Sequence, residues 1–218
     1  MEIKTFALCV KAQDFRESDK LLTLVSTNLG KIDVLARGIR SAKAKLKPAA
    51  MPLCFGEYIL ARTASTFTLI GCSITDNFFN CWSDLHKYAA SQIILELIGK
   101  ITYTDSDIHS KIELVYAIKA LSAINYSTTF PYLPSIWYIL KILPQVGIDI
   151  NDIKSIESLK PIIDVILESS PEETDSIDIS LKAVIDILKA LNIQLKNSDI
   201  GKTNSITEGL KLLSEIPI

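Results

Sequence analysis

The chain has 218 residues, of which 48% are apolar and 22% are charged, and this composition is typical of folded proteins rather than disordered chains. The formal net charge of −2 hides an uneven distribution: residues 1–62 carry 11 basic and six acidic residues, whereas residues 63–218 carry 12 and 19. All four arginines lie in the first part. Because a guanidinium group matches phosphate oxygens and can also lie flat on a base, this basic part is a candidate surface for a polyanion.

Residues 1–75 show the alternation of apolar and polar side chains that is typical of half-buried strands. The segment Asn28–Lys31 has the Asn and Gly residues of a hairpin turn. A longer connection follows the third strand. This pattern predicts a five-stranded β-barrel of the OB type, although an SH3-like barrel would show similar periodicity. The expected strands are residues 6–11, 21–27, 32–37, 53–61 and 67–74.

From about residue 79 the apolar side chains recur at helical spacing, and the second part is expected to be mainly helical. The chain is therefore predicted to be an α+β protein, with a barrel domain at 1–78 and a helical domain at 79–218. Residues 149–178 are acidic and interrupted by prolines, so loops, local mobility and one short helix at 161–168 are expected there. The other expected helices are residues 79–99, 111–121, 133–143 and 181–191.

The last of the four cysteines is Cys81, and no two of them form a CxxC pair. They are expected to be buried, reduced thiols, and we expect neither a metal ion nor another cofactor. Lys4 and Lys11 interrupt the first apolar stretch, so no export signal is expected. Pro131 and Pro134 argue against a membrane span in the uncharged run 120–140.

Four short segments between residues 14 and 52 carry a more specific pattern. They are Asp14–Leu24 (DFRESDKLLTL), Leu29–Ile32 (LGKI), Ala36–Arg40 (ARGIR) and Leu46–Pro52 (LKPAAMP). In residue type, order and spacing they resemble the N-terminal domain of the RecO family of bacterial DNA-repair proteins. The match is strong over this stretch, whereas the second half resembles the family only as a helical region of suitable length.

The resemblance implies a recombination mediator of the bacterial cytoplasm, associated with the nucleoid. Such a protein binds single-stranded and duplex DNA, anneals complementary strands, and works with RecR to load the RecA recombinase onto DNA coated by single-stranded DNA-binding protein (SSB). It is not an enzyme. The sequence agrees, because the GxxxxGK[ST], HExxH and GxSxG motifs are absent. Asp105 and Asp107 resemble a nuclease metal pair, but helix capping explains them better.

The residue types also agree with DNA binding. Five cations lie close together at positions 37–47, where a barrel surface could follow a phosphate backbone. Aromatic faces on such a barrel can stack on bases, although an aromatic residue in a barrel is more often part of the core. The expected DNA-binding residues are Arg37, Arg40, Lys43, Lys45, Lys47, Arg16, Lys20 and Arg62, and the stacking candidates are Phe15, Tyr58 and Phe67.

The second half departs from the family in two places. Many RecO proteins have a four-cysteine zinc site in the C-terminal domain, and here no cysteine follows Cys81, so the chain resembles the members without zinc. In the central helix, Trp137–Leu140 stands where the family commonly has Arg-Phe-Glu-Leu. An acidic, aromatic-ended SSB tail requires an apolar pocket beside a cation, and the candidates for this contact are Lys111, Trp137 and Lys141.

Two other functions agree with the same residues. The barrel could bind RNA, or the acidic helical part could hold partner proteins without any nucleic acid. The alternatives differ in their response to salt, because only a nucleic-acid interface releases counterions when it binds an oligonucleotide.

Overall fold

A computed structural model describes residues 1–63, 66–103 and 108–216. The chain forms two compact units, here called the barrel unit and the helical unit. The barrel unit comprises Met1–Phe78 and Ile98–Val115, and the helical unit comprises Phe79–Leu97 and the chain from Tyr116 onward. Asp105 and Asp107 lie outside the described residues.

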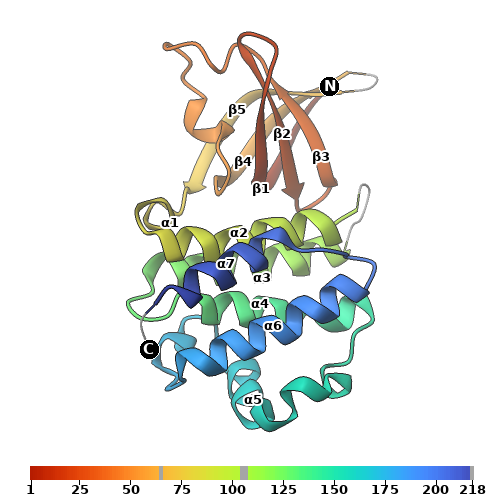
Figure 1. The fold of residues 1–218 in the computed structure, drawn as a ribbon. Coiled ribbons are helices and arrows are strands. Elements are labelled where there is room, and N and C mark those ends of the chain that lie inside the picture. The colour runs from red at the N-terminus through yellow and green to blue at the C-terminus, as the bar shows by residue number, and fades with distance from the viewer. Residues whose placement is uncertain (64–65, 104–107, 217–218) are drawn as a thin grey trace. The chain divides into compact units, whose positions relative to one another are not determined.

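The five strands of the barrel unit form a closed barrel in the order β1-β2-β3-β5-β4, drawn in red to yellow in Figure 1. All neighbouring strands are antiparallel except β3 and β5. The expected OB-type barrel is therefore confirmed, including the hairpin turn after β2 and the long connection after β3. The strands are β1 (Glu2–Phe15), β2 (Asp19–Ser26), β3 (Gly30–Ala36), β4 (Phe55–Arg62) and β5 (Phe67–Asp76).

Strand β1 closes the barrel because it pairs with two neighbours. Residues 2–8 pair with β4, residues 7–15 pair with β2, and the register shifts between Cys9 and Lys11. Such a bulge bends a strand and increases its twist, which barrel closure requires. Alternate side chains of the strands point inward and form one apolar core, which includes Cys9, Leu22, Leu24, Val34, Tyr58 and Leu60.

The second part is mainly helical, as expected. In the helical unit, α4 is buried along almost its whole length, and α6 packs against both α4 and α7 (Figure 1). No helix in the described ranges is long and apolar enough to cross a membrane. The helices are α1 (Asn80–Ser83), α2 (Leu85–Ile101), α3 (Ile108–Tyr126), α4 (Tyr132–Ile142), α5 (Lys160–Glu168), α6 (Leu181–Asn197) and α7 (Asn204–Ser214).

The helices differ from the sequence predictions in several places: α3 and α6 are longer than expected, and three further differences concern α1, α2 and α7. The single helix expected at 79–99 is broken at Asp84, which has an extended backbone. The Asp84 side chain accepts a hydrogen bond from the Lys87 N–H at 2.8 Å and so caps the start of α2. Gly99 does not end α2, and its carbonyl accepts a hydrogen bond from Lys31 Nζ at 2.8 Å. Helix α7 was not predicted, although Ile206 and Leu213 have helical spacing and are buried.

The acidic region 149–178 contains more regular structure than loops. The expected short helix is present as α5, and 3-10 helices occupy Ile150–Asp152, Lys154–Leu159 and Glu173–Ser176. Asp175 holds the last of these to the loop after α3. Its carboxylate accepts hydrogen bonds from the hydroxyl groups of Ser127, Thr128 and Thr129, at 2.6–2.8 Å.

Candidate nucleic-acid interface

The turn between β1 and β2 carries the first of the predicted DNA-binding residues. Arg16 has a left-handed backbone (φ 55°), and its carbonyl accepts a hydrogen bond from Arg40 Nη1 at 3.2 Å. Its guanidinium carbon lies 5.1 Å from the centre of the Phe15 ring, within the range of a cation–π contact. The turn therefore presents a cation and an aromatic ring together at the surface.

The connection between β3 and β4 carries most of the other cations, and its first residues are fixed to this turn. Gly38 has a positive φ of 61°, and its N–H donates to Asp19 Oδ1 at 2.8 Å. The Arg40 N–H donates to the Ser18 carbonyl at 3.0 Å. These hydrogen bonds join two segments that are distant in the sequence and place Arg40 beside the turn.

Asp19 is the acidic centre of this contact. The Gly38 N–H holds the pKa of the Asp19 carboxyl below its ordinary value, and the Ser18 hydroxyl and the positive charges of Arg16 and Arg37 act in the same direction. The carboxylate is therefore charged at neutral pH. It organises the backbone of the basic segment and also cancels part of its charge.

Three predicted cations surround one hollow of about 320 Å³. Lys20, Arg40 and Lys47 supply its charge, and the remaining lining is apolar: Ile39, Ala50 and Met51. Arg40 also pairs with Asp14 at 3.3 Å, with both side chains largely exposed, so this pair adds little stability and can open for a phosphate. The hollow thus combines three cations with an apolar lining, here called its floor.

The floor of the hollow is held from the barrel core. Lys47–Ala50 form a 3-10 helix (η1), and the hydroxyl of Tyr58 donates to the Ala49 carbonyl at 2.8 Å. Tyr58 is completely buried, so its ring has no face to offer to a base. Its assignment as a stacking candidate is therefore corrected: it supports the interface from below.

The remaining candidates of the barrel unit lie outside the hollow. Arg37, Lys43 and Lys45 are exposed on the β3–β4 connection. Arg62 is exposed at the end of β4, and its guanidinium carbon lies 5.5 Å from the centre of the half-buried Phe67 ring. Phe15 is 39% exposed and, like Phe67, is accompanied by an arginine. Both rings therefore retain exposed surface, unlike Tyr58.

Trp137 and Lys141, predicted to contact the SSB tail, lie side by side in the helical unit, where Trp137 is buried and Lys141 is half-buried. Trp137 is only 4% exposed, and its Nε1 donates to the Ser169 carbonyl at 3.0 Å. Lys141 Nζ donates to the Leu167 carbonyl at 2.9 Å and lies 5.6 Å from the Trp137 ring centre. Both side chains hold the end of α5 against α4. Lys111 is exposed on α3, in the part that belongs to the barrel unit.

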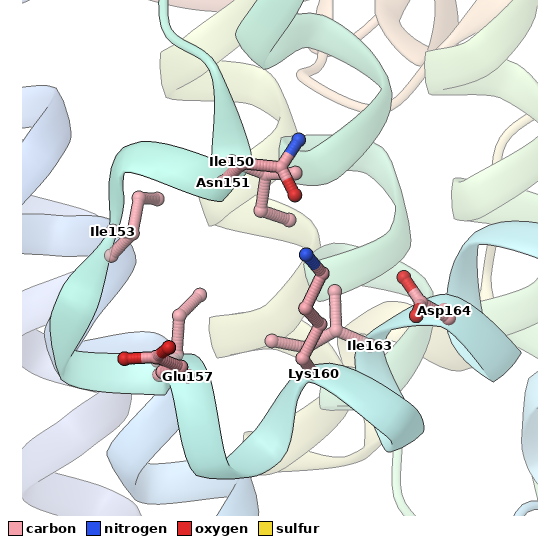
Figure 2. A pocket seen from close by; sticks show the side chains of 8 residues that line it. Ile150, Asn151, Ile153, Glu157, Lys160, Ile163 and Asp164 are labelled. Atoms are coloured by element: carbon pink, nitrogen blue, oxygen red, sulfur yellow. The ribbon is translucent and has the colours of Figure 1, made fainter.

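Sequence reasoning missed a second hollow, which lies in the helical unit. Figure 2 shows side chains from the two 3-10 helices after Gly147 and from the start of α5 around a space of about 220 Å³. The ammonium group of Lys160 points into this space, and Glu157 and Asp164 lie at its rim. The walls of this hollow are formed by Ile150, Ile153, Ile156 and Ile163. The regular spacing of these isoleucines was the sequence signal that could have revealed the hollow.

None of the four cysteines forms a disulfide, and Cys72 alone is not fully buried. Within the described parts of the chain, no group of three or more His, Cys, Asp or Glu side chains is placed to hold a metal ion.

Comparison with known proteins identifies the barrel. Residues 1–78 match the family model described as "Recombination protein O N terminal". The barrel is therefore similar in sequence to the N-terminal domain of RecO proteins. The RecO match contains every DNA-binding residue predicted from the sequence, whereas Trp137, Lys141 and the isoleucine hollow lie beyond it.

Relatives named "DNA repair protein RecO" agree with this result. The protein of Clostridium novyi (strain NT) is 36% identical over 95 residues, which cover 44% of this chain and 37% of the relative. That of Clostridium perfringens is 34% identical over 96 residues, covering 44% and 39%. That of Desulfitobacterium hafniense (strain DSM 10664 / DCB-2) is 33% identical over 96 residues, covering 44% and 35%. The matched part thus spans less than two-fifths of each RecO relative.

Proposed function

We propose that this chain acts in DNA repair by binding DNA through the basic surface of its barrel. The observation that carries the proposal is the hollow lined by Lys20, Arg40 and Lys47, whose backbone is fixed by the Asp19–Gly38 hydrogen bond. Preorganised cations lose less conformational entropy on binding than cations on a flexible loop. The match of residues 1–78 to the RecO N-terminal domain supports the same ligand.

The proposed activity is the annealing of complementary strands, in which no covalent bond changes. Cations that neutralise phosphates reduce the repulsion between two strands, and contacts to phosphates leave the base edges free to pair. A matched pair of assays tests this role: complementary strands of roughly 30 nucleotides, about twice the largest OB-fold site, are mixed with and without the protein. Faster pairing supports the proposal, and an unchanged rate with bound protein contradicts it.

We further propose that the chain works with RecR to place RecA on SSB-coated DNA. The support for these partners is the family resemblance alone. The matched segment covers less than two-fifths of each relative, whereas the partners are those of the whole RecO protein. Co-sedimentation with RecR, followed by a RecA filament assay on SSB-coated DNA, tests the two steps separately.

For the SSB tail, we move the proposed contact from Trp137 and Lys141 to the isoleucine hollow of Figure 2. Apolar walls beside the ammonium group of Lys160 meet the two requirements of an acidic, aromatic-ended tail. Glu157 and Asp164 oppose an acidic peptide, so the contact is expected to be weak and to strengthen when Glu157 is replaced by Gln. Binding of a tail peptide that Lys160→Glu leaves unchanged contradicts this placement.

A further inference from the structure

The basic hollow of the barrel has one feature that phosphate binding does not use. Lys20, Arg40 and Lys47 account for its charge, but Ile39, Ala50 and Met51 line the rest, and Met51 is 44% exposed. In a duplex the bases are stacked inside the helix, so their faces cannot reach such a floor. A single strand can turn an unstacked base toward protein while its phosphates stay on the cations.

We propose that this hollow is a subsite for one nucleotide of a single DNA strand, with the base against the exposed Met51 side chain and the flanking phosphates on Lys20, Arg40 and Lys47. The inference rests on the proposed DNA-binding function and deepens it. The size of the hollow, about 320 Å³, lies at the lower end of the range of roughly 300–1,000 Å³ for small-ligand pockets.

The usual base-stacking residues do not occupy this position. Tyr58 is buried beneath the hollow, and neither Phe15 nor Phe67 lines it. A methionine can take their place, because its unbranched and polarizable thioether packs favourably against flat aromatic groups. A base is such a group, and every base has a face, so the subsite is expected to favour unpaired DNA without selecting its sequence.

The position of Met51 is fixed by the fold. Met51 directly follows η1, whose Ala49 carbonyl is held by Tyr58, and the Cys54 N–H donates to the Met51 carbonyl at 3.3 Å. The backbone of Arg40 is fixed separately, because its N–H donates to the Ser18 carbonyl at 3.0 Å. The apolar floor and one of its cations are thus anchored independently, and a nucleotide can bridge them without reordering the chain.

The test compares two probes of about 12 nucleotides, a length within the site size of one OB fold: a mixed-sequence strand and a strand of abasic sites with the same phosphates. Replacing Met51 by Ser should weaken binding of the normal strand by about 2- to 10-fold, the range of a sulfur–aromatic contact. It should leave binding of the abasic strand unchanged. Met51→Leu keeps an apolar floor, so its affinity for the normal strand should fall less than that of Met51→Ser.

Ile70→Ser is the matched control, because Ile70 is similarly exposed (48%) on β5 and does not line the hollow. It should bind both probes as the original protein does. If Met51→Ser binds the normal strand as tightly as the original protein, or weakens both probes equally, the nucleotide subsite is wrong although DNA binding stands. If the original protein binds neither probe, the proposed function itself is wrong.

Discussion

The backbone nitrogen of Gly38 lies 2.8 Å from Oδ1 of Asp19, and this hydrogen bond joins the turn after β1 to the basic connection after β3. Gly38 has a left-handed backbone, which glycine adopts without strain, so the chain can turn there and carry Arg40 back to Ser18. Asp19 is an acidic residue within a basic surface, and its role there is to hold the backbone of the basic connection in place.

Replacing Asp19 by Ala should release the start of the basic connection. The Gly38 and Arg40 amides should then exchange their hydrogens faster, which hydrogen–deuterium exchange measures. Glu17→Ala is the control, because it removes the same charge from the same turn, and Glu17 forms no hydrogen bond or ion pair with another described residue. Equal exchange at Gly38 in both variants would show that Asp19 does not hold the segment.

The triple variant Arg37→Ala, Arg40→Ala, Lys43→Ala should bind DNA of all sequences more weakly while the barrel stays folded. The plot of log affinity against log salt for a single strand should become less steep by about 2, since each lost phosphate contact contributes about 0.7. The control replaces three exposed lysines of α6, Lys182, Lys189 and Lys196, by Ala. If the folded triple variant binds DNA as the original protein does, Arg37, Arg40 and Lys43 are not part of the site.

Tyr58→Phe should destabilise the barrel by about 1–2 kcal/mol, because the buried Ala49 carbonyl loses its hydrogen-bond donor. Burial raises the pKa of the Tyr58 hydroxyl, so the group stays protonated and donates throughout the neutral range. Urea unfolding measures the change. Tyr126→Phe, at a position that is 69% exposed, should have no effect, and an equal loss in both variants would contradict the assigned role.

Asp175→Ala should lower the free energy of unfolding by about 1 kcal/mol, a value reduced for the partial exposure of the site. Partial burial by itself raises the pKa of Asp175, but the hydrogen bonds from Ser127, Thr129 and Thr128 together outweigh it and hold the pKa well below its ordinary value. This stabilisation is complete above the unfolded pKa of about 3.9 and is lost as the pH falls through the lower folded value.

Asp178→Ala is the control for that prediction, because Asp178 is exposed and has no hydrogen-bond or ion-pair partner among the described residues. The difference in stability between the two variants should be largest near neutral pH and should shrink in acid. A difference that is independent of pH would mean that the charge of Asp175 does not stabilise the fold.

The barrel could be predicted from the sequence because strands and tight turns leave patterns among residues that are close together in the chain. Inward residues such as Leu22 and Leu24 alternate with outward ones, and the Asn-Leu-Gly turn marks a strand boundary. The helix breaks were less visible, because Asp84 interrupts an apolar pattern that continues through it. Helix α7 could have been found from the spacing of Ile206 and Leu213, whereas the 3-10 helices of the acidic region have no comparable periodic signal.

The candidate site was predictable in its residue types and less so in its arrangement. The cluster of Arg and Lys at 37–47 is visible in the sequence, but the contact between Asp19 and Gly38 depends on how two distant segments meet. Tyr58 and Trp137 have the residue types of binding sites, and only their burial separates them from the surface. Met51 lies in the segment Leu46–Pro52 that resembles the family, but it became a binding candidate only through its place in the hollow.

DNA binding by the barrel is best measured by titrating a labelled single DNA strand of roughly 30 nucleotides with the protein at three salt concentrations. We expect tight binding, and log affinity should fall against log salt with a slope of about −3.5, because each of five phosphate contacts on a single strand contributes about −0.7. Absence of binding even at low salt, or binding that is insensitive to salt, would contradict a cationic DNA interface on this barrel.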